Sequence, residues 1–108
     1  MQCALLYITF SDEAAARALG RKLVEARLAA CANIFASMIP IFRWEDQIQE
    51  DSESVMIAKT RKELVEEATD FIKRNHDYDC PCVVALPLEG GNKDFLEWIV
   101  EETKDPET

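Results

Sequence analysis

The sequence predicts an α+β sandwich, in which an antiparallel β-sheet carries helices on one face. Short apolar, strand-favouring runs alternate along the chain with segments in which apolar residues recur every three or four positions. The resulting order of elements is βαββαβ, and right-handed crossovers in its two βαβ halves place both helices on the same side of a four-stranded sheet. This arrangement is the ferredoxin-like fold, and a further amphipathic segment adds a C-terminal helix.

A strand and a helix open the chain. Residues 3–10 form a short apolar run that contains several strand-favouring side chains. Residues 12–28 place apolar side chains on one broad helical face. Ser11 or Asp12 can cap the first turn of this helix, and the charges of Asp12 and Glu13 suit the positive end of the helix dipole.

A long hairpin follows. Residues 31–44 predict one long and irregular strand, in which Pro40 requires an edge position or a bulge because proline has no N–H to donate. The polar and acidic residues 45–53 predict the hairpin tip, and residues 54–60 predict the returning strand. Such a hairpin is too long for a domain of this size, and the sheet face without helices also needs a cover.

The second half of the chain repeats the helix and the strand. Residues 80–88 predict the fourth strand, and Asn92 predicts the cap of the last helix. The acidic residues 101–108 are expected to form a frayed tail. The helix before the fourth strand carries the apolar stripe Leu64, Ala68, Phe71 and Ile72.

Composition limits the class of protein. A chain of 108 residues is one domain, here residues 1–108, and a domain of this size buries only part of its surface, so an oligomer is expected. The net charge of −9 argues against nucleic acid and against anionic membranes as partners. No run is long enough to span a membrane and no signal peptide is recognised, so a cytoplasmic location with four reduced cysteines is expected.

Four segments, taken in order, resemble one family. They are Leu28-Ala29-Ala30-Cys31-Ala32-Asn33-Ile34, Phe42-Arg43-Trp44-Glu45, Lys59-Thr60 and His76-Asp77-Tyr78-Asp79-Cys80-Pro81. Over roughly residues 4 to 100 the chain is similar to the CutA divalent-cation tolerance proteins. The resemblance implies the ferredoxin-like fold, a tight homotrimer in which the 31–60 hairpin reaches a neighbour, and a role in tolerance of divalent cations, copper among them. The chain departs from the family at Asp77, where proline is usual, and at Cys82, where glutamate is usual.

Cys80-Pro81-Cys82 is the sharpest local signal for chemistry. On an extended strand the two cysteines point to one face with Cα atoms about 6.6–7 Å apart, at or beyond the limit for a disulfide. Two thiolates at that spacing can hold one soft metal ion, and copper(I) suits so few sulfur ligands. The alternative is that both are small apolar residues packed on the sheet.

Two other residues are candidate metal ligands. His76, the only histidine, can supply a nitrogen, or it can interact with the last carbonyl groups of the preceding helix. Cys31 can supply a third sulfur, as the family resemblance suggests, or it can be a small residue at a helix-to-strand junction.

A ligand-binding cleft between subunits is predicted from four residues. Clefts at subunit boundaries are common ligand sites, and the resemblance places Trp44, Lys59, His76 and Tyr78 there. Two alternatives remain open: Trp44 as a core or interface aromatic, and Lys59 as one half of a structural salt bridge, because lysine is rarely buried without a partner.

The function expected from these observations is binding rather than catalysis. No nucleophile, base and acid can be assembled around the single histidine, so we do not expect an enzyme. The first hypothesis is a homotrimer that responds to a metal ion or small ligand, with copper or another divalent or soft ion as its only implied cofactor. The alternatives are a copper buffer or chaperone that uses Cys80 and Cys82, or a trimeric scaffold or signalling module resembling the PII proteins.

Overall fold

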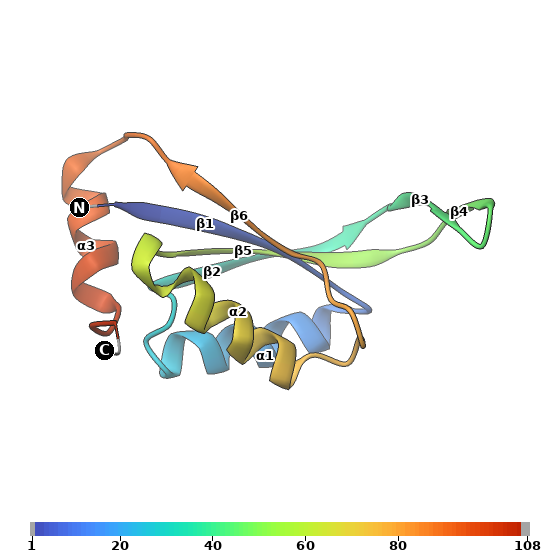
Figure 1. The fold of residues 1–108 in the computed structure, drawn as a ribbon, viewed down its shortest axis with the longest axis horizontal. Coiled ribbons are helices and arrows are strands. Elements are labelled where there is room, and N and C mark those ends of the chain that lie inside the picture. Colours follow the sequence, from blue (N-terminus) through green and yellow to red (C-terminus); the bar gives the residue numbers. More distant parts are fainter. Residues whose placement is uncertain (1, 107–108) are drawn as a thin grey trace.

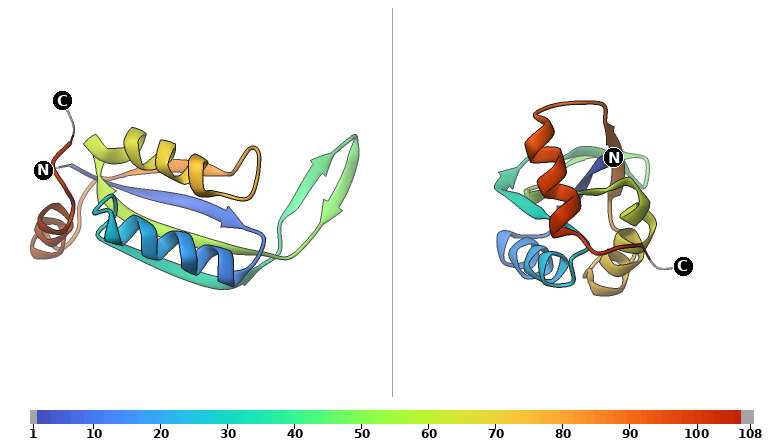
Figure 2. Two further views of the ribbon diagram at one scale, coloured as in Figure 1. Left: turned by 90° about the horizontal axis from the view of Figure 1, so that it is seen from below. Right: turned by 90° about the vertical axis from the view of Figure 1, so that its left-hand side faces the viewer.

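The structure, a computed structural model, describes residues 2–106 and confirms the α+β sandwich (Figure 1). Its elements are β1 (Cys3–Phe10), α1 (Glu13–Glu25), β2 (Cys31–Met38), β3 (Ile41–Trp44), β4 (Gln47–Glu50), β5 (Glu53–Arg61), the 3-10 turn η1 (Lys62–Leu64), α2 (Val65–Asn75), β6 (Val83–Leu88) and α3 (Lys93–Glu102). The main sheet has the strand order β2-β5-β1-β6, and every neighbouring pair is antiparallel. The helices α1 and α2 cover one face of this sheet, and α3 crosses its end (Figure 2).

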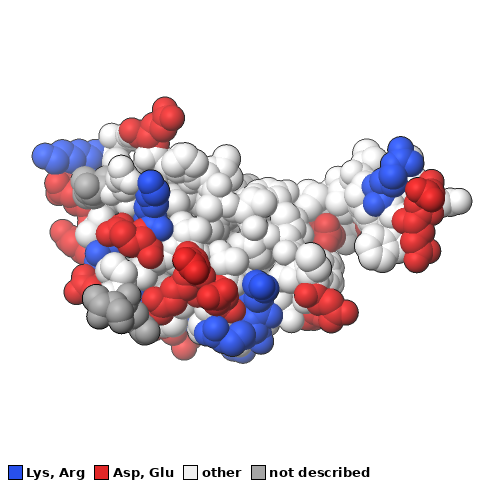
Figure 3. Space-filling model, viewed as in Figure 1, with Lys and Arg blue, Asp and Glu red and all other residues white. Residues whose placement is uncertain are grey.

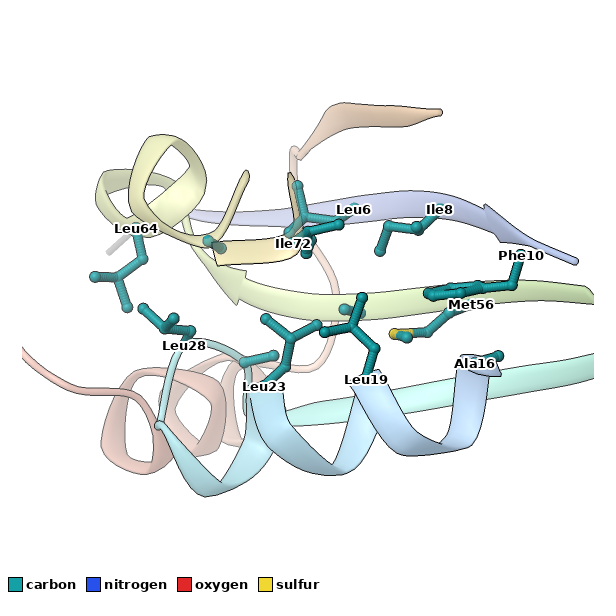
Figure 4. Packing of buried hydrophobic residues seen from close by; sticks show 13 residues of the cluster. Leu6, Ile8, Phe10, Ala16, Leu19, Leu23, Leu28, Met56, Leu64 and Ile72 are labelled. Carbon is teal, nitrogen blue, oxygen red and sulfur yellow. The ribbon is translucent and has the colours of Figure 1, made fainter. Parts of the chain in front are cut away.

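The core lies between the sheet and the two covering helices (Figure 4). The central strands pair with Leu6 opposite Ala58 and Ile8 opposite Met56, so these alternate side chains share the helix-facing side. All four are fully buried. From α1, Leu19 and Leu23 point into the same cluster because the apolar face of the helix repeats every three to four residues.

The first helix begins as the sequence predicts and ends earlier. The Asp12 carboxylate accepts a hydrogen bond from the Ala15 amide at 2.8 Å and caps the first turn. The helix stops at Glu25 rather than at residue 28, because Arg27 adopts a left-handed backbone conformation with φ of 59°. This reversal lets Leu28 turn inward, where it is buried against the core.

The long hairpin differs from the prediction. The main-sheet strand stops at Met38 after a register shift, and residues 41–50 form a separate two-stranded ribbon, called the arm here, that projects beyond the sheet (Figure 1). Its tip is only Glu45–Asp46, both with positive φ as two-residue hairpin turns require, so residues 47–50 are strand rather than tip. Pro40 interrupts the pairing at the arm's root, since its nitrogen cannot donate to the ladder.

The C-terminal segment also differs from the prediction. The helix α3 continues to Glu102, and Thr103 is 4% exposed, so the chain is ordered and anchored through Thr103 rather than frayed from residue 101. Arg61 holds this end: its guanidinium donates to the carbonyl groups of Val100 and Thr103 and lies 3.1 Å from the Asp105 carboxylate. Residues 107–108 of the expected tail lie outside the described residues.

The sheet face opposite the helices is apolar and uncovered over much of its area. We call it the open face and define it by the alternate residues Leu5, Tyr7, Phe35, Ile57, Val84 and Leu86. Phe35, Val84 and Leu86 are 55%, 51% and 50% exposed. In Figure 3 the charged side chains gather over the helices and the arm tip, while the surface above the sheet is largely uncharged. None of the helices in residues 2–106 is both long and apolar enough to cross a bilayer.

Candidate functional site

A wide hollow at the root of the arm is the main candidate site. It has a volume of about 790 Å³, and we call it the arm-root hollow. It brings Trp44 of the arm together with Tyr78, Cys80 and Cys82 of the segment between α2 and β6, although these residues are far apart in the sequence. Its walls are Tyr7, Thr9, Met38, Ile39, Pro40, Ile41, Phe42, Trp44, Asp51, Glu53, Tyr78, Cys80 and Cys82.

His76 fixes the path of the chain beside this hollow. Its Nδ1 accepts a hydrogen bond from the Tyr78 amide at 3.0 Å, so its Nε2 carries the proton and donates to the Thr9 carbonyl group at 2.8 Å. The ring also stacks on Phe10, with centroids 4.7 Å apart. Both nitrogens therefore serve the fold, and a metal could bind His76 only by displacing one of these bonds. The partner is a strand carbonyl group, not the last carbonyl groups of the helix.

Tyr78 ties the same segment to the strand at the arm's root. Its hydroxyl donates to the Glu53 carboxylate at 2.6 Å. Burial and this bond to an acceptor raise the pKa of Tyr78 well above its ordinary value, because both favour the neutral phenol. Glu53 begins β5 and lies opposite Met38 in the sheet register. This hydrogen bond and the strand pairing together link three separate parts of the hollow.

The Tyr78–Glu53 bond predicts a loss of stability in alkali. The raised pKa means that the folded protein keeps the phenol proton that the unfolded chain loses near pH 10, so this contribution is complete below about pH 10 and falls as the pH rises further. Urea unfolding between pH 8 and 11 should show a steeper alkaline loss for the native protein than for Tyr78→Phe. The control Tyr7→Phe keeps the bond to Glu53 and should retain the steeper loss. Equal slopes in all three proteins would contradict the prediction.

The two neighbouring cysteines are not on a strand, contrary to the prediction. The strand β6 begins only at Val83, and Cys80, Pro81 and Cys82 belong to the bend before it. The argument from alternating strand faces therefore does not apply. Both thiols are free and exposed, and both line the arm-root hollow. Across residues 2–106, no three side chains of the types His, Cys, Asp and Glu come together as a metal site.

Cys31 and Lys59 form a second, separate cluster on the open-face side of the sheet. They are cross-strand partners, and the Lys59 ammonium lies 3.9 Å from the Cys31 sulfur. The ammonium donates to the Asn33 side-chain oxygen at 2.6 Å and lies 5.9 Å from the centre of the Phe95 ring. The salt bridge considered for Lys59 is not among the ion pairs of the described residues.

Distance along the sheet keeps this second cluster away from the hollow in one subunit. Lys59 lies six residues after Glu53 on the same strand, about 20 Å at the usual rise. The structure therefore brings together Trp44, Tyr78 and two cysteines and leaves Lys59 and Cys31 apart.

Three residues of these sites were missed from the sequence, and only weak signals pointed to them. Met38 and Glu53 flank the arm, and Asn33 alternates with Cys31 along β2. The alternation of side chains along a strand could have paired Asn33 with Cys31, since residues i and i+2 share a face. Nothing in the sequence places Met38 on the same hollow as Cys80, because that arrangement depends on how the 76–82 segment folds back.

Comparison with known proteins agrees with the observed fold. The chain matches the family model of the CutA1 divalent ion tolerance protein over residues 4–102. The divalent-cation tolerance protein CutA of Archaeoglobus fulgidus is 43% identical over 96 residues, covering 89% of this chain and 93% of that protein. The crystal structure of CutA1 from Oryza sativa superposes with a TM-score of 0.94 at 36% identity, covering 97% of this chain and 96% of that one.

Some relatives are longer. Protein CutA, chloroplastic, of Arabidopsis thaliana is 39% identical over 100 residues, which cover 93% of this chain and 55% of that protein. The chain thus spans about half the length of the plant and animal relatives it matches. The family match nevertheless runs along nearly all of the described residues. This chain therefore belongs to the CutA1 divalent ion tolerance protein family.

Proposed function

We propose that the protein works as a homotrimer in tolerance of, or response to, divalent metal ions, copper among them. It binds a metal ion or a small ligand at clefts between its subunits. Family membership supports the tolerance role, since relatives such as the protein of Thermus thermophilus carry the name divalent-cation tolerance protein. A cytoplasmic, reducing location is part of this proposal and is consistent with the four free thiols.

The open face is the observation that carries the proposal. Large apolar side chains exposed together on a sheet are typical of surfaces that bind another protein. Phe35, Val84 and Leu86 each leave half or more of their surface in contact with solvent in a single chain. Association would remove this area from water, at about 25 cal/mol per Å² of apolar surface. The arm, with exposed Ile41 and Ile48, extends the same apolar character beyond the sheet.

The proposed clefts combine the two clusters described above. Trp44 and Tyr78 line the arm-root hollow, and Lys59 lies on the open-face side of the sheet. If the open face is the subunit interface, both clusters border it, and one subunit can complete the site of another. The role is one of binding, since both nitrogens of His76, the only histidine, are engaged within the chain. A signalling role like that of the PII proteins would use the same trimer.

A copper(I) buffer or chaperone is the second candidate function. One observation favours it: Cys80 and Cys82 are both free and exposed on the wall of the same hollow. Thiolates prefer soft ions such as copper(I).

Native mass spectrometry of freshly purified protein tests the proposal. The expected result is a trimer that retains, or takes up on titration with copper, about one ion per subunit. A parallel titration with magnesium is the control, since a soft site should not retain this hard ion. A folded single subunit at micromolar concentration would contradict the trimer and the cleft between subunits. A trimer that takes up neither copper nor a metabolite would contradict the binding role.

A further inference from the structure

We propose that Cys80, Cys82 and Met38 form a three-sulfur site for copper(I) in the arm-root hollow. This inference rests on the copper-binding candidate above and adds to it a ligand from a different strand. All three sulfur-bearing side chains line the same hollow. The two cysteines are exposed and Met38 is partly buried, so an ion can reach the cysteines from solvent while the methionine closes the site from the protein side.

The register of the sheet places Met38 beside the cysteine segment. Met38 is the last residue of β2 and lies opposite Glu53. The Glu53 carboxylate accepts the hydrogen bond of Tyr78 at 2.6 Å, and Cys80 follows two residues later. Glu53 therefore connects the end of β2 to the segment that carries Cys80. It pairs with Met38 in the sheet and accepts the Tyr78 hydrogen bond, and neither contact needs a bound ion.

The cysteine segment is also held at both of its ends. On one side, His76 accepts from the Tyr78 amide and donates to the Thr9 carbonyl group. On the other side, Val83 begins β6 and pairs with Ile8 of the central sheet. Between these anchors Pro81 has a fixed φ, which leaves few conformations for the two thiols to lose on binding. The segment is thus preorganised for a ligand.

The chemistry of the donors selects copper(I) over other ions. Thiolate and thioether sulfurs prefer soft ions, and two or three of them satisfy copper(I). A closed zinc site needs four ligands, and the described residues hold no group of three His, Cys, Asp or Glu side chains suited to a metal. Two carboxylates, Asp51 and Glu53, also line the hollow, and Glu53 already accepts from Tyr78. Binding of one copper(I) ion would release two protons, one from each thiol, and none from Met38.

The other candidate ligands named from the sequence do not fit this site. Cys31 lies beside Lys59 in the second cluster, far along the sheet. His76 uses both ring nitrogens to hold the segment. Met38 takes the place of both, and its long flexible side chain suits a site that must adjust to an ion.

Anaerobic titration with copper(I) against a chromogenic competitor tests the inference in four proteins. Relative to the native protein, the variant with both Cys80→Ser and Cys82→Ser should lose affinity by more than about a hundredfold. The affinity of Met38→Leu for copper(I) should fall at least about tenfold, because even the loss of a residue that only supports a metal ligand typically costs that much. Cys31→Ser is the matched control and should bind as the native protein does. X-ray absorption of the copper-loaded forms should count three sulfur ligands in the native protein and two in Met38→Leu.

Each outcome decides something different. Unchanged affinity and an unchanged sulfur count in Met38→Leu would overturn the role of Met38. If the cysteine variant lost binding in the same experiment, the copper-binding function would still stand. Unchanged affinity in the cysteine variant, or a loss in Cys31→Ser equal to it, would overturn the site. A native protein that binds no copper(I) would overturn both the site and the copper-binding function. Circular dichroism of each variant confirms that the fold is retained.

Discussion

Replacement of Phe10 by alanine is expected to lower the free energy of unfolding by about 3–5 kcal/mol, the usual cost of removing a buried phenylalanine. Phe10 is 1% exposed and belongs to the main core cluster. Its ring also stacks on His76, so the substitution leaves a cavity and removes a support of the cysteine segment. A domain is stable by only about 5–15 kcal/mol, so this loss is a large fraction of the total.

Urea unfolding at one fixed protein concentration measures this loss, since the stability of an oligomer depends on concentration. Phe95→Ala is the matched control: its ring is 43% exposed, and we expect a loss of about 1 kcal/mol or less. Hydrogen exchange gives a second readout, because the Tyr78 amide donates to His76 and should exchange faster in Phe10→Ala. Equal losses in the two variants would show that Phe10 does not hold the core as described.

Leu86→Asp is expected to abolish the proposed trimer while leaving the subunit folded. Leu86 lies opposite Leu5 on the open face and is 50% exposed in one chain, so a carboxylate there remains hydrated in the free subunit. In an assembly that covers this face the same carboxylate would be buried without a partner, which costs several kcal/mol for each subunit. Three such charges would outweigh the gain from burying the face.

Sedimentation velocity at micromolar concentration, together with circular dichroism, measures the result. Val24→Asp is the control, because Val24 is 40% exposed but lies on α1, in the helical layer on the other side of the sheet. We expect this control to sediment as the native protein does. A trimeric Leu86→Asp, or a Val24→Asp that dissociates equally, would show that the open face is not the interface.

The arm shows where sequence reasoning was insufficient. Pro40 correctly indicated an irregularity, because a missing N–H has the same consequence in any fold. The short strand β4 was missed because its residues Gln47–Glu50 are mostly polar, and a ribbon exposed on both faces needs no apolar alternation. The two-residue turn depends on positive φ at Glu45 and Asp46, residues for which the sequence gives no strong preference.

The candidate site was only partly predictable for a similar reason. Trp44, Tyr78, Cys80 and Cys82 were chosen from the sequence for their chemistry, and all four line the arm-root hollow. Cys80 and Cys82 were nevertheless placed on a strand, because a run that continues into apolar residues gives no sign of where pairing starts. Met38 was not chosen, since methionine usually fills space in a core and its role here depends on its neighbours.

The sequence by itself determined the order of the elements, the ferredoxin-like sandwich and the family, because these depend on local periodicity and on residues in fixed order along the chain. Only the tertiary structure decided which chemically capable residues meet. Hydrogen bonds from His76 and Tyr78 hold the cysteine segment against the end of β1 and the start of β5, and the sheet register separates Cys31 and Lys59 from it. Such contacts join residues tens of positions apart, and they are fixed by packing and register rather than by any local preference.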